Sequence, residues 1–324
     1  MLKPFAYVRA GSLDEAVKHL TLEESVVHAG GTDLLGCLRD RIFEAGTVVS
    51  ISGLKNLHGI SRSPSGGLRL GALTTVTEIA RDPFIHEHYK GLARAALEVA
   101  SPQLRNQGTI GGNICQKPRC WYYRGDFHCL RKGGNLCYAV GGENAFHCIF
   151  GGENCYIVHP SDTAPALAAL EAVVHIQGPK GKRAVPIEAF HVLPSEDFTR
   201  ETVLETGEIV TEIELPPPIP GLRSTYRKVR ARRSWDFALA GVALAMVMEG
   251  KRVTKARIFL SGAAPIPWRW KEVEALITGK SLDSGLIRQA AEAAVRNAQP
   301  MEQNAYKIPL FRAVIEEELQ TATR

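Results

Sequence analysis

VVHAGGTDLL, residues 26–35, joins a β-branched run to two glycines, which lead into leucines suited to a helix. Gly30 and Gly31 carry no Cβ, so backbone N–H groups are able to approach a ligand closely at this turn. Thr32 or Asp33 is able to cap the helix that follows. The stretch therefore predicts either a phosphate-binding turn or an ordinary corner between a strand and a helix.

A second turn of the same kind is GTIGGNI, residues 108–114. It offers the Thr109 hydroxyl, the glycines Gly111 and Gly112, and the Asn113 amide. Two such turns suit the two phosphates of one dinucleotide, although two structural corners would look alike in the sequence. The motifs G-x-G-x-x-G, G-x-x-x-x-G-K-[ST], G-x-S-x-G and H-E-x-x-H are absent, which excludes a standard Rossmann fingerprint, a P-loop, a nucleophile elbow and a zincin site.

Composition excludes several other classes of protein. The 324 residues are 45% hydrophobic, which is enough for ordinary cores in one to three domains. A net charge of +5 comes from scattered Lys and Arg, so we expect no nucleic-acid partner. The sequence contains no apolar stretch of about 18 residues, so we expect no membrane span. The opening MLKPFAYVRAGSLDEAV lacks the apolar core of a leader, so we expect a cytoplasmic protein with reduced thiols.

Five of the seven cysteines fall within 36 residues, at positions 120, 129, 137, 148 and 155. Reduced thiols in such a cluster indicate metal or iron–sulfur ligation rather than disulfides. No C-x-x-C spacing occurs, which disfavours a zinc ribbon. A glycine-containing loop is able to wrap one iron–sulfur cluster with four thiolates. A zinc site that includes His128, His147 or His159, and a set of buried free thiols, remain alternatives; Cys37 and Cys115 are not expected to be ligands.

The order of elements predicts two domains. Helix and strand signals alternate at first, with a capping box at Ser12 and Glu15 and helical residues over 77–101. The segment LPPPIPG (215–221) holds four prolines, which continue neither a helix nor a central strand, so we take it as a linker. Strand-like TYRKVRAR and ARIFLSG follow, and then two helical stretches, SGLIRQAAEAAVRNA and LFRAVIEEELQT. In the plainest interpretation, Asp162 caps a helix and Lys228 is an exposed strand lysine.

Together these motifs resemble the FAD-binding medium subunits of molybdenum hydroxylases, the group of xanthine dehydrogenase, aerobic carbon monoxide dehydrogenase and 4-hydroxybenzoyl-CoA reductase. The resemblance covers nearly the whole chain. It rests on KPFAYVRAGSLDEAV, AGGTDLL, TIGGNI, HPSDTAPAL, GEIVTEIELP, YRKVRARRSWDFALAGVA and SGAAPIPWR, in this order. It implies an α/β FAD-binding domain of the PCMH type with two subdomains over 1–220, and a smaller α+β, CO-dehydrogenase-flavoprotein-like domain over 221–324.

The resemblance also implies which residues bind FAD. The first turn would contribute Ala29, Gly30, Gly31, Thr32 and Asp33. The second turn would contribute Thr109, Gly111, Gly112 and Asn113. Asp162 and Lys228 match positions that contact the flavin nucleotide in relatives. Backbone amides suit the diphosphate, and side chains suit the ribityl chain and the ring.

The cysteine loop, about 116–158, resembles an insertion of the 4-hydroxybenzoyl-CoA reductase type that binds a [4Fe-4S] cluster. RCWYY, CLRKGGNLC and ENCYIVHPSD match its pattern and select Cys120, Cys129, Cys137 and Cys155, hereafter the four-cysteine set. The interval from Cys137 to Cys155 is longer than in that reductase, so an alternative alignment uses Cys148 in place of Cys129. Arg131 and Lys132 are then expected to offset the negative charge of the cluster or to receive an acidic carrier.

These features predict an electron-transfer flavin and iron–sulfur subunit with no catalytic residue for substrate chemistry. The resemblance implies a small [2Fe-2S] subunit, a large molybdopterin subunit that hosts the substrate, and ferredoxin, NAD or another external carrier. The organic substrate and the direction of electron flow are not encoded in this chain. A non-catalytic zinc-stabilised module and a stand-alone flavin oxidase of the same wider fold are the rival interpretations.

Overall fold

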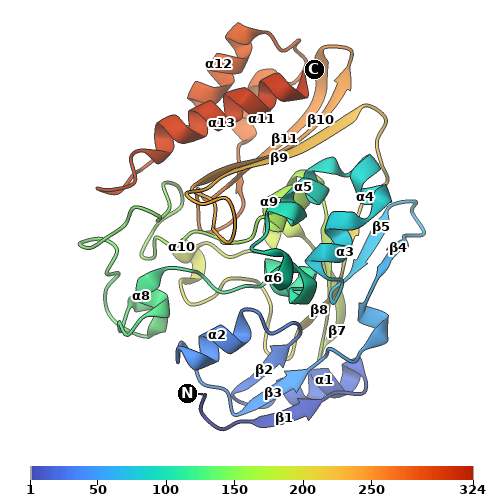
Figure 1. Ribbon diagram of the computed structural model, residues 1–324, viewed down its shortest axis with the longest axis vertical. Helices are drawn as coiled ribbons and strands as arrows, with labels where there is room; N and C mark the ends of the chain where they lie inside the picture. Colours follow the sequence, from blue (N-terminus) through green and yellow to red (C-terminus); the bar gives the residue numbers. More distant parts are fainter. Residues whose placement is uncertain (1, 324) are drawn as a thin grey trace.

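The computed structural model describes residues 2–323 and begins with a small parallel sheet, drawn in blue in Figure 1. Its strand order is β1-β3-β2, so the last strand of the three lies in the middle. Helix α1 connects β1 to β2, and helix α2 connects β2 to β3. The elements are β1 (Ala6–Arg9), α1 (Leu13–Leu20), β2 (Ser25–His28), α2 (Leu34–Arg39) and β3 (Thr47–Ser50).

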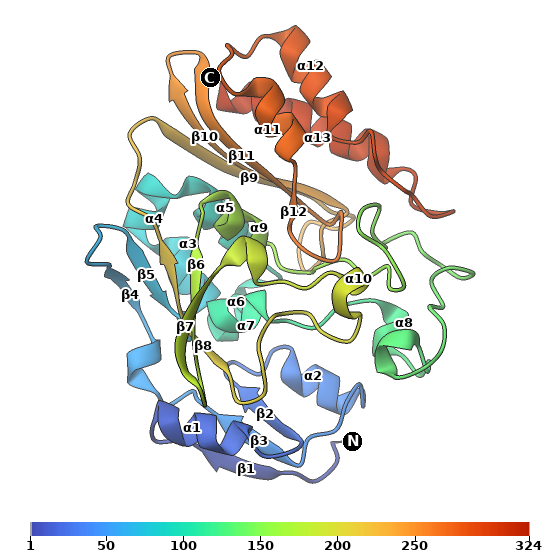
Figure 2. The same cartoon turned by 180° about the vertical axis from the view of Figure 1, so that it is seen from behind.

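An antiparallel five-stranded sheet of order β4-β5-β8-β6-β7 forms the centre of the molecule. Helices α5 (Lys90–Glu98) and α9 (Thr163–Ala169) lie between it and the third sheet (Figures 1 and 2). The strands are β4 (Ile60–Arg62), β5 (Leu68–Gly71), β6 (Val173–Gly178), β7 (Gly181–Pro186) and β8 (Ile209–Leu215). The helices are η1 (Lys55–Leu57), α3 (Val76–Arg81), α4 (Pro83–His88), α5 (Lys90–Glu98), α6 (Pro102–Gln107), α7 (Ile110–Ile114), α9 (Thr163–Ala169), η3 (Ile187–Ala189) and α10 (Pro194–Asp197).

The third sheet is antiparallel, has the order β12-β11-β10-β9, and is buried on both faces. Along β10, Ala243 and Ala245 pack toward α5 and α9, whereas Val242 and Leu244 pack toward the C-terminal helices. This explains why FALAGVALAMVM is apolar throughout rather than alternating. The elements are β9 (Leu222–Val229), β10 (Ala240–Glu249), β11 (Arg252–Ser261), β12 (Trp268–Arg269), α11 (Lys271–Ile277), α12 (Ser284–Ala293) and α13 (Lys307–Ala322).

The cysteine loop contains only two short helices, α8 (Trp121–Arg124) and η2 (Leu130–Lys132). It protrudes beside α13 and the third sheet (Figure 1). Ile149 and Phe150 anchor it by donating their backbone N–H groups to the Ala263 carbonyl, at 2.8 and 3.1 Å. Both side chains enter the core beneath the C-terminal helices. The loop is therefore irregular in secondary structure but packed against the fold.

The predicted mixed α/β architecture is confirmed, and two local predictions need correction. The expected single helical stretch over 77–101 is three helices, because Pro83 cannot continue α3 and Asp82 instead caps α4. The capping box at α1 is half formed: the Ser12 hydroxyl accepts from the Glu15 N–H, but the Glu15 carboxylate accepts from Gly11. Among residues 2–323, no helix is both long and apolar enough to span a bilayer.

Candidate cofactor site

The two glycine turns lie against each other. A Cβ added to Gly30 would overlap with the Gln107 carbonyl oxygen and lie 2.8 Å from its carbon. One added to Gly108 would lie 3.6 Å from the Thr32 hydroxyl. Residues distant in the sequence therefore form one surface, and Gly30 is required because the backbones approach so closely.

The first turn keeps free hydrogen-bond donors. The backbone N–H groups of Gly30, Gly31 and Thr32 donate to no other residue in the described part of the chain. Gly31 has a φ of +72°, a conformation that favours glycine. Consecutive unpaired N–H groups in a turn of this kind form a concave site for an anion. The turn thus fits a phosphate, which is one of the two interpretations that its sequence allows.

The second turn is built differently, because its own fold uses its donors. Thr109 caps α7 by accepting from the Gly112 N–H at 3.2 Å. The Gly111 N–H donates to the Ala72 carbonyl at 2.9 Å, and an added Cβ there would meet Ala72 at 3.0 Å. The Asn113 carboxamide oxygen accepts from the hydroxyls of Ser161 and Thr163, at 2.6 and 2.7 Å. This turn therefore positions its neighbours rather than offering free amides.

Asp162 and Lys228 form a buried ion pair with a Nζ–Oδ2 distance of 2.7 Å. Their side chains are 6% and 1% exposed, so the interpretation of Lys228 as an exposed strand lysine is wrong. Asp162 also accepts from the Tyr226 hydroxyl at 2.7 Å and makes no side-chain cap to α9; the Ser161 hydroxyl accepts from Ala164 there instead. Burial raises the pKa of the Asp162 carboxyl, while Lys228 and Tyr226 oppose that shift.

Lys228→Met is expected to lower the free energy of unfolding by about 3–5 kcal/mol, because it leaves the Asp162 carboxylate buried without a counter-charge. Thermal and denaturant unfolding of the purified chain measure this loss. Lys182→Met, on the exposed strand β7, is the matched control and should change stability by less than about 0.5 kcal/mol. Equal effects of the two substitutions would contradict the buried pair.

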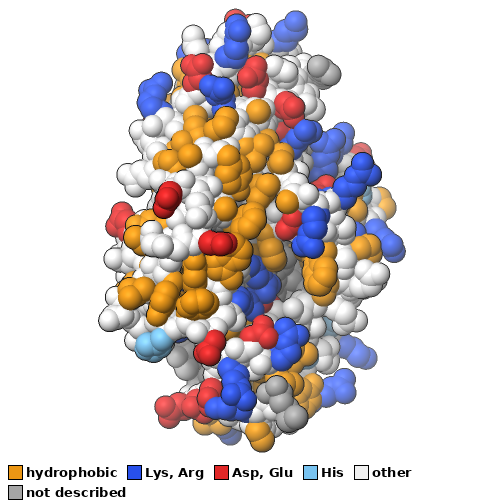
Figure 3. All heavy atoms as spheres, turned by 60° about the vertical axis from the view of Figure 1, so that its left-hand side comes forward, with side chains coloured by type: hydrophobic (Ala, Val, Ile, Leu, Met, Phe, Trp, Pro, Cys, Tyr) orange, Lys and Arg blue, Asp and Glu red, His pale blue; other side chains and the backbone are white. Residues whose placement is uncertain are grey.

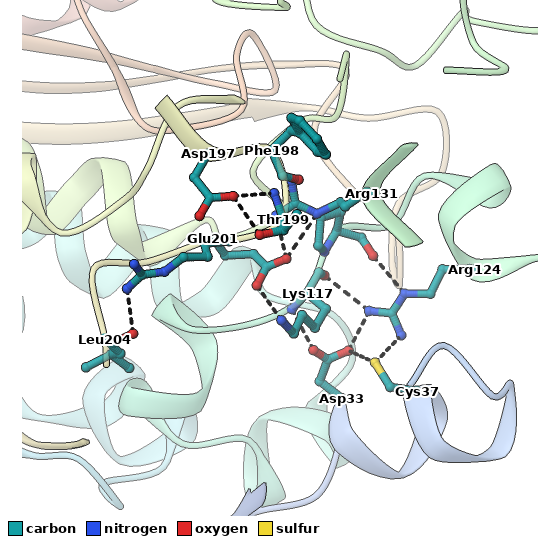
Figure 4. A network of polar contacts seen from close by, with 12 residues as sticks. Asp33, Cys37, Lys117, Arg124, Arg131, Asp197, Phe198, Thr199, Glu201 and Leu204 are labelled. Carbon is teal, nitrogen blue, oxygen red and sulfur yellow. Dashed lines mark hydrogen bonds and ion pairs between the residues drawn. The ribbon is translucent and has the colours of Figure 1, made fainter. Parts of the chain in front are cut away.

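The Asp33 carboxylate faces the cysteine loop. It pairs with Arg119 at 2.6 Å. It also pairs with Arg124 at 2.7 Å and accepts from the Lys117 backbone N–H at 2.7 Å (Figure 4). Arg124 also donates to the Cys37 sulfur at 2.9 Å. Asp33 occupies the N-cap position of α2 but makes no side-chain cap, so the predicted capping by this residue is wrong. The carboxylate instead ties the first turn to the start of the cysteine loop.

The four-cysteine set lines one hollow, hereafter the thiol cavity, with an empty volume of about 320 Å³ that includes space open to solvent. Cys148 does not line it, but it is buried close to Cys137 and Cys155. Tyr122, Tyr123, Tyr138 and His147 are among the other lining residues. The resemblance selected the same four cysteines from five candidates, and the fold brings them together around one space.

The spacing of these sulfurs does not fit one mononuclear ion. A single zinc ion, with Zn–S bonds of about 2.3 Å, holds its ligand atoms within about 4 Å of one another. Within residues 2–323, the only three or more Cys, His, Asp or Glu ligand atoms within 4.8 Å of one another belong to His175, Glu212 and Glu214, which lie outside the cysteine loop. Four thiols that line one hollow without such close spacing are compatible with a polynuclear group.

Burial favours the protonated form of two thiols of the cavity, Cys120 and Cys155. Burial raises the pKa of Cys120 to about 12, and it also raises the pKa of Cys155, where Arg131 opposes the shift. A thiolate in such a place needs a cationic partner, and binding of metal releases the protons. The donor set and its burial therefore fit a metal cluster held within the loop.

Arg131 is held inside the protein, not displayed on the surface. Its guanidinium is 2% exposed, pairs with Glu201 at 2.6 Å and donates to the Phe198 carbonyl (Figure 4). Lys132 donates to the Gly125 carbonyl at 2.7 Å. Arg131 lies beside Cys155 and is placed to offset negative charge, but its burial contradicts the expectation that it receives an external carrier.

Several large hydrophobic side chains of the cysteine loop are exposed. We call this group the apolar collar; it consists of Trp121, Phe127, Leu136, Val140 and Phe146, with Tyr306 beside it. Figure 3 presents the side of the molecule on which the loop protrudes, and hydrophobic side chains gather along the middle of that face. Exposed apolar side chains gathered in one segment are typical of contact sites for other macromolecules.

Several residues of the site were not predicted from the sequence. Tyr226 had a usable signal, because it lies two positions before Lys228 and side chains alternate along a strand. Glu201 had none, since it approaches Lys117 and Arg131 from 84 and 70 residues away. His147, predicted only as one of several zinc alternatives, lines the thiol cavity with its Nε2 3.3 Å from the Cys120 sulfur.

The chain is similar to flavin subunits along its whole length. Residues 3–218 match the family model described as the FAD binding domain in molybdopterin dehydrogenase, and residues 224–320 match the CO dehydrogenase flavoprotein C-terminal domain. The chain is 34% identical to the aldehyde oxidoreductase FAD-binding subunit PaoB of Escherichia coli (strain K12), over 97% of this chain and 96% of that protein. It is 29% identical to the carbon monoxide dehydrogenase medium chain of Hydrogenophaga pseudoflava, over 93% of this chain and 90% of that protein.

Solved structures agree with this similarity. A structure of carbon monoxide dehydrogenase from Hydrogenophaga pseudoflava that lacks the Mo-pyranopterin moiety matches with a TM-score of 0.79 at 27% identity. The match covers 99% of this chain and 98% of that chain. Reconstituted CO dehydrogenase from Oligotropha carboxidovorans shares the fold with a TM-score of 0.80 at 22% identity.

Proposed function

Because this chain belongs to the family of FAD-binding subunits of molybdenum hydroxylases, we propose that it is the flavin subunit of such a complex and carries an additional [4Fe-4S] cluster. The observation that carries the proposal is the thiol cavity, which gathers the four-cysteine set beside a flavin-binding fold. The insertion of the 4-hydroxybenzoyl-CoA reductase type remains part of this proposal. The division into domains over 1–220 and 221–324 is part of it as well.

FAD is assigned to the two glycine turns. The free N–H groups of Gly30, Gly31 and Thr32 support diphosphate binding at the first turn, where Ala29 completes the backbone. The residues of the second turn would support the site rather than donate to the diphosphate, because most of their hydrogen-bonding groups are already paired. They are Thr109, Gly111, Gly112 and Asn113. Asp162 and Lys228 would support the flavin site as a rigid polar pair, and Asp33 would fix the first turn to the cysteine loop.

The cluster is assigned to the four-cysteine set. When bound, FAD exchanges electrons in pairs and an iron–sulfur cluster exchanges them singly, so both groups together connect one-electron and two-electron carriers. The protein buries Cys129 and Cys155 and half-buries Cys120 and Cys137, lines the cavity with the rings of Tyr122, Tyr123 and Tyr138, and places Arg131 beside Cys155. This arrangement supports electron transfer and offers no acid–base pair for substrate chemistry.

The proposed partners are a small [2Fe-2S] subunit, a large molybdopterin subunit and an external carrier such as ferredoxin or NAD. The apolar collar supports contact with another protein, because exposed apolar surface of this kind is stabilised when it is covered. The seven cysteines are free thiols, which supports a reducing compartment, the cytoplasm.

A spectrum of the anaerobically purified chain tests the proposed function. We expect resolved flavin bands together with a broad absorption that dithionite bleaches. A stand-alone flavin oxidase would show the flavin bands without the broad absorption. A colourless protein that contains zinc would contradict the proposal and favour the zinc-stabilised module.

A further inference from the structure

His147 directs one ring nitrogen at a cysteine of the proposed cluster. Its Nε2 lies 3.3 Å from the Cys120 sulfur, and its side chain is almost fully buried. The other ring nitrogen, Nδ1, has no hydrogen-bond partner within the described residues. A buried N–H without an acceptor is more costly than a bare ring nitrogen. The proton of the neutral ring therefore belongs on Nε2, where it meets the sulfur.

The C-terminal domain holds His147 in this place. Lys307 is fully buried at the start of α13 and donates its ammonium group to the carbonyls of Phe146, His147 and Gly262. The Asn304 amide donates to the carbonyls of His147 and Cys148, at 3.0 and 3.1 Å. Two polar side chains of the C-terminal domain, about 160 residues further along the chain, thus fix the backbone at this histidine. A loop residue with no role beyond filling space does not require such support.

We propose that His147 is a positioning residue that donates its Nε2–H to the Cys120 sulfur and thereby raises the reduction potential of the [4Fe-4S] cluster. This inference rests on the proposed function. An N–H donor stabilises negative charge on a ligand sulfur, and reduction adds one negative charge to the cluster. The donor therefore favours the reduced state more than the oxidised state, and the potential becomes more positive.

The variants that test this inference differ in where they place a side-chain nitrogen. In His147→Gln the amide nitrogen reaches the place of Nε2, whereas in His147→Asn it reaches only the place of Nδ1. His147→Leu removes both nitrogens. His128 is the matched control, because it too directly precedes a cysteine but is exposed and does not line the thiol cavity. The control variant is therefore His128→Asn.

Redox titration of the anaerobically purified chain, monitored by electron paramagnetic resonance after iron and sulfide are counted, tests the inference. We expect His147→Asn and His147→Leu to keep their iron and to shift the cluster to a more negative potential. His147→Gln and His128→Asn should keep the wild-type potential.

Three results would overturn the inference in distinguishable ways. An unchanged potential in His147→Asn would show that this hydrogen bond does not tune the cluster. Loss of iron from His147→Gln, with iron retained in the wild type, would make His147 a ligand. A wild-type chain without iron and sulfide would overturn the proposed function itself, and the inference with it. If His147→Leu fails to fold, the comparison of the Gln and Asn variants still decides whether the hydrogen bond sets the potential of the cluster.

Discussion

Each single substitution of the four-cysteine set by serine is expected to reduce the iron content from about four atoms per chain to less than about one. All four sulfurs line the same cavity, and a cubane cluster needs one ligand for each iron. The loss should leave FAD in place, because the free amides of the first turn lie outside the cavity. Iron, sulfide and flavin are measured on anaerobically purified variants.

Cys148→Ser is the matched control for these substitutions. Cys148 is buried and lies in the same loop, but it does not line the thiol cavity. Its serine variant should therefore keep its iron. Loss of iron from Cys148→Ser together with full iron in Cys129→Ser would show that the alternative alignment is right. This pair of variants decides the one choice that the sequence leaves open.

Gly30→Ala is expected to weaken FAD binding by about 100-fold, as the loss of one or two amide hydrogen bonds to a charged group would do. The new Cβ would overlap with the Gln107 carbonyl, so the first turn must move away from the second. The measurement is the FAD dissociation constant of the deflavinated chain, by fluorescence titration. The iron content should stay unchanged, because the overlap lies outside the cysteine loop.

Gly36→Ala provides the control six residues away. No atom lies within 4 Å of a Cβ at Gly36, and the residue is in helix α2. Alanine is favoured there by about 0.5–1 kcal/mol, so this variant should bind FAD normally and melt no earlier than the wild type. Normal FAD binding by Gly30→Ala would contradict the close approach of the two turns as the basis of the site.

The sequence was most informative where local chemistry decides the structure. Ser12 caps the first helix as expected, and the proline-rich segment forms a connection without helix or strand between β8 and β9. The spacing of the cysteines did not decide between an iron–sulfur cluster, a zinc site and free thiols. Only the resemblance to a known family selected four of them as ligands.

The sequence was least informative where a side chain chooses between distant partners. Asp33 looked like a cap, yet Arg119 and Arg124 take its carboxylate from more than 80 residues away. The sequence around Lys228 indicates an exposed lysine, because no residue of its strand predicts that Asp162 will lie against it. Such choices depend on packing of whole elements, and the free energy of a paired buried charge then overrides local preference.

The iron, sulfide and zinc content of the wild-type chain, purified without oxygen, tests the central claim most directly. We expect about four iron and about four sulfide per FAD, with little zinc. Stoichiometric zinc without sulfide would contradict it, and the thiol cavity would then be a structural metal site in an otherwise ordinary flavin subunit.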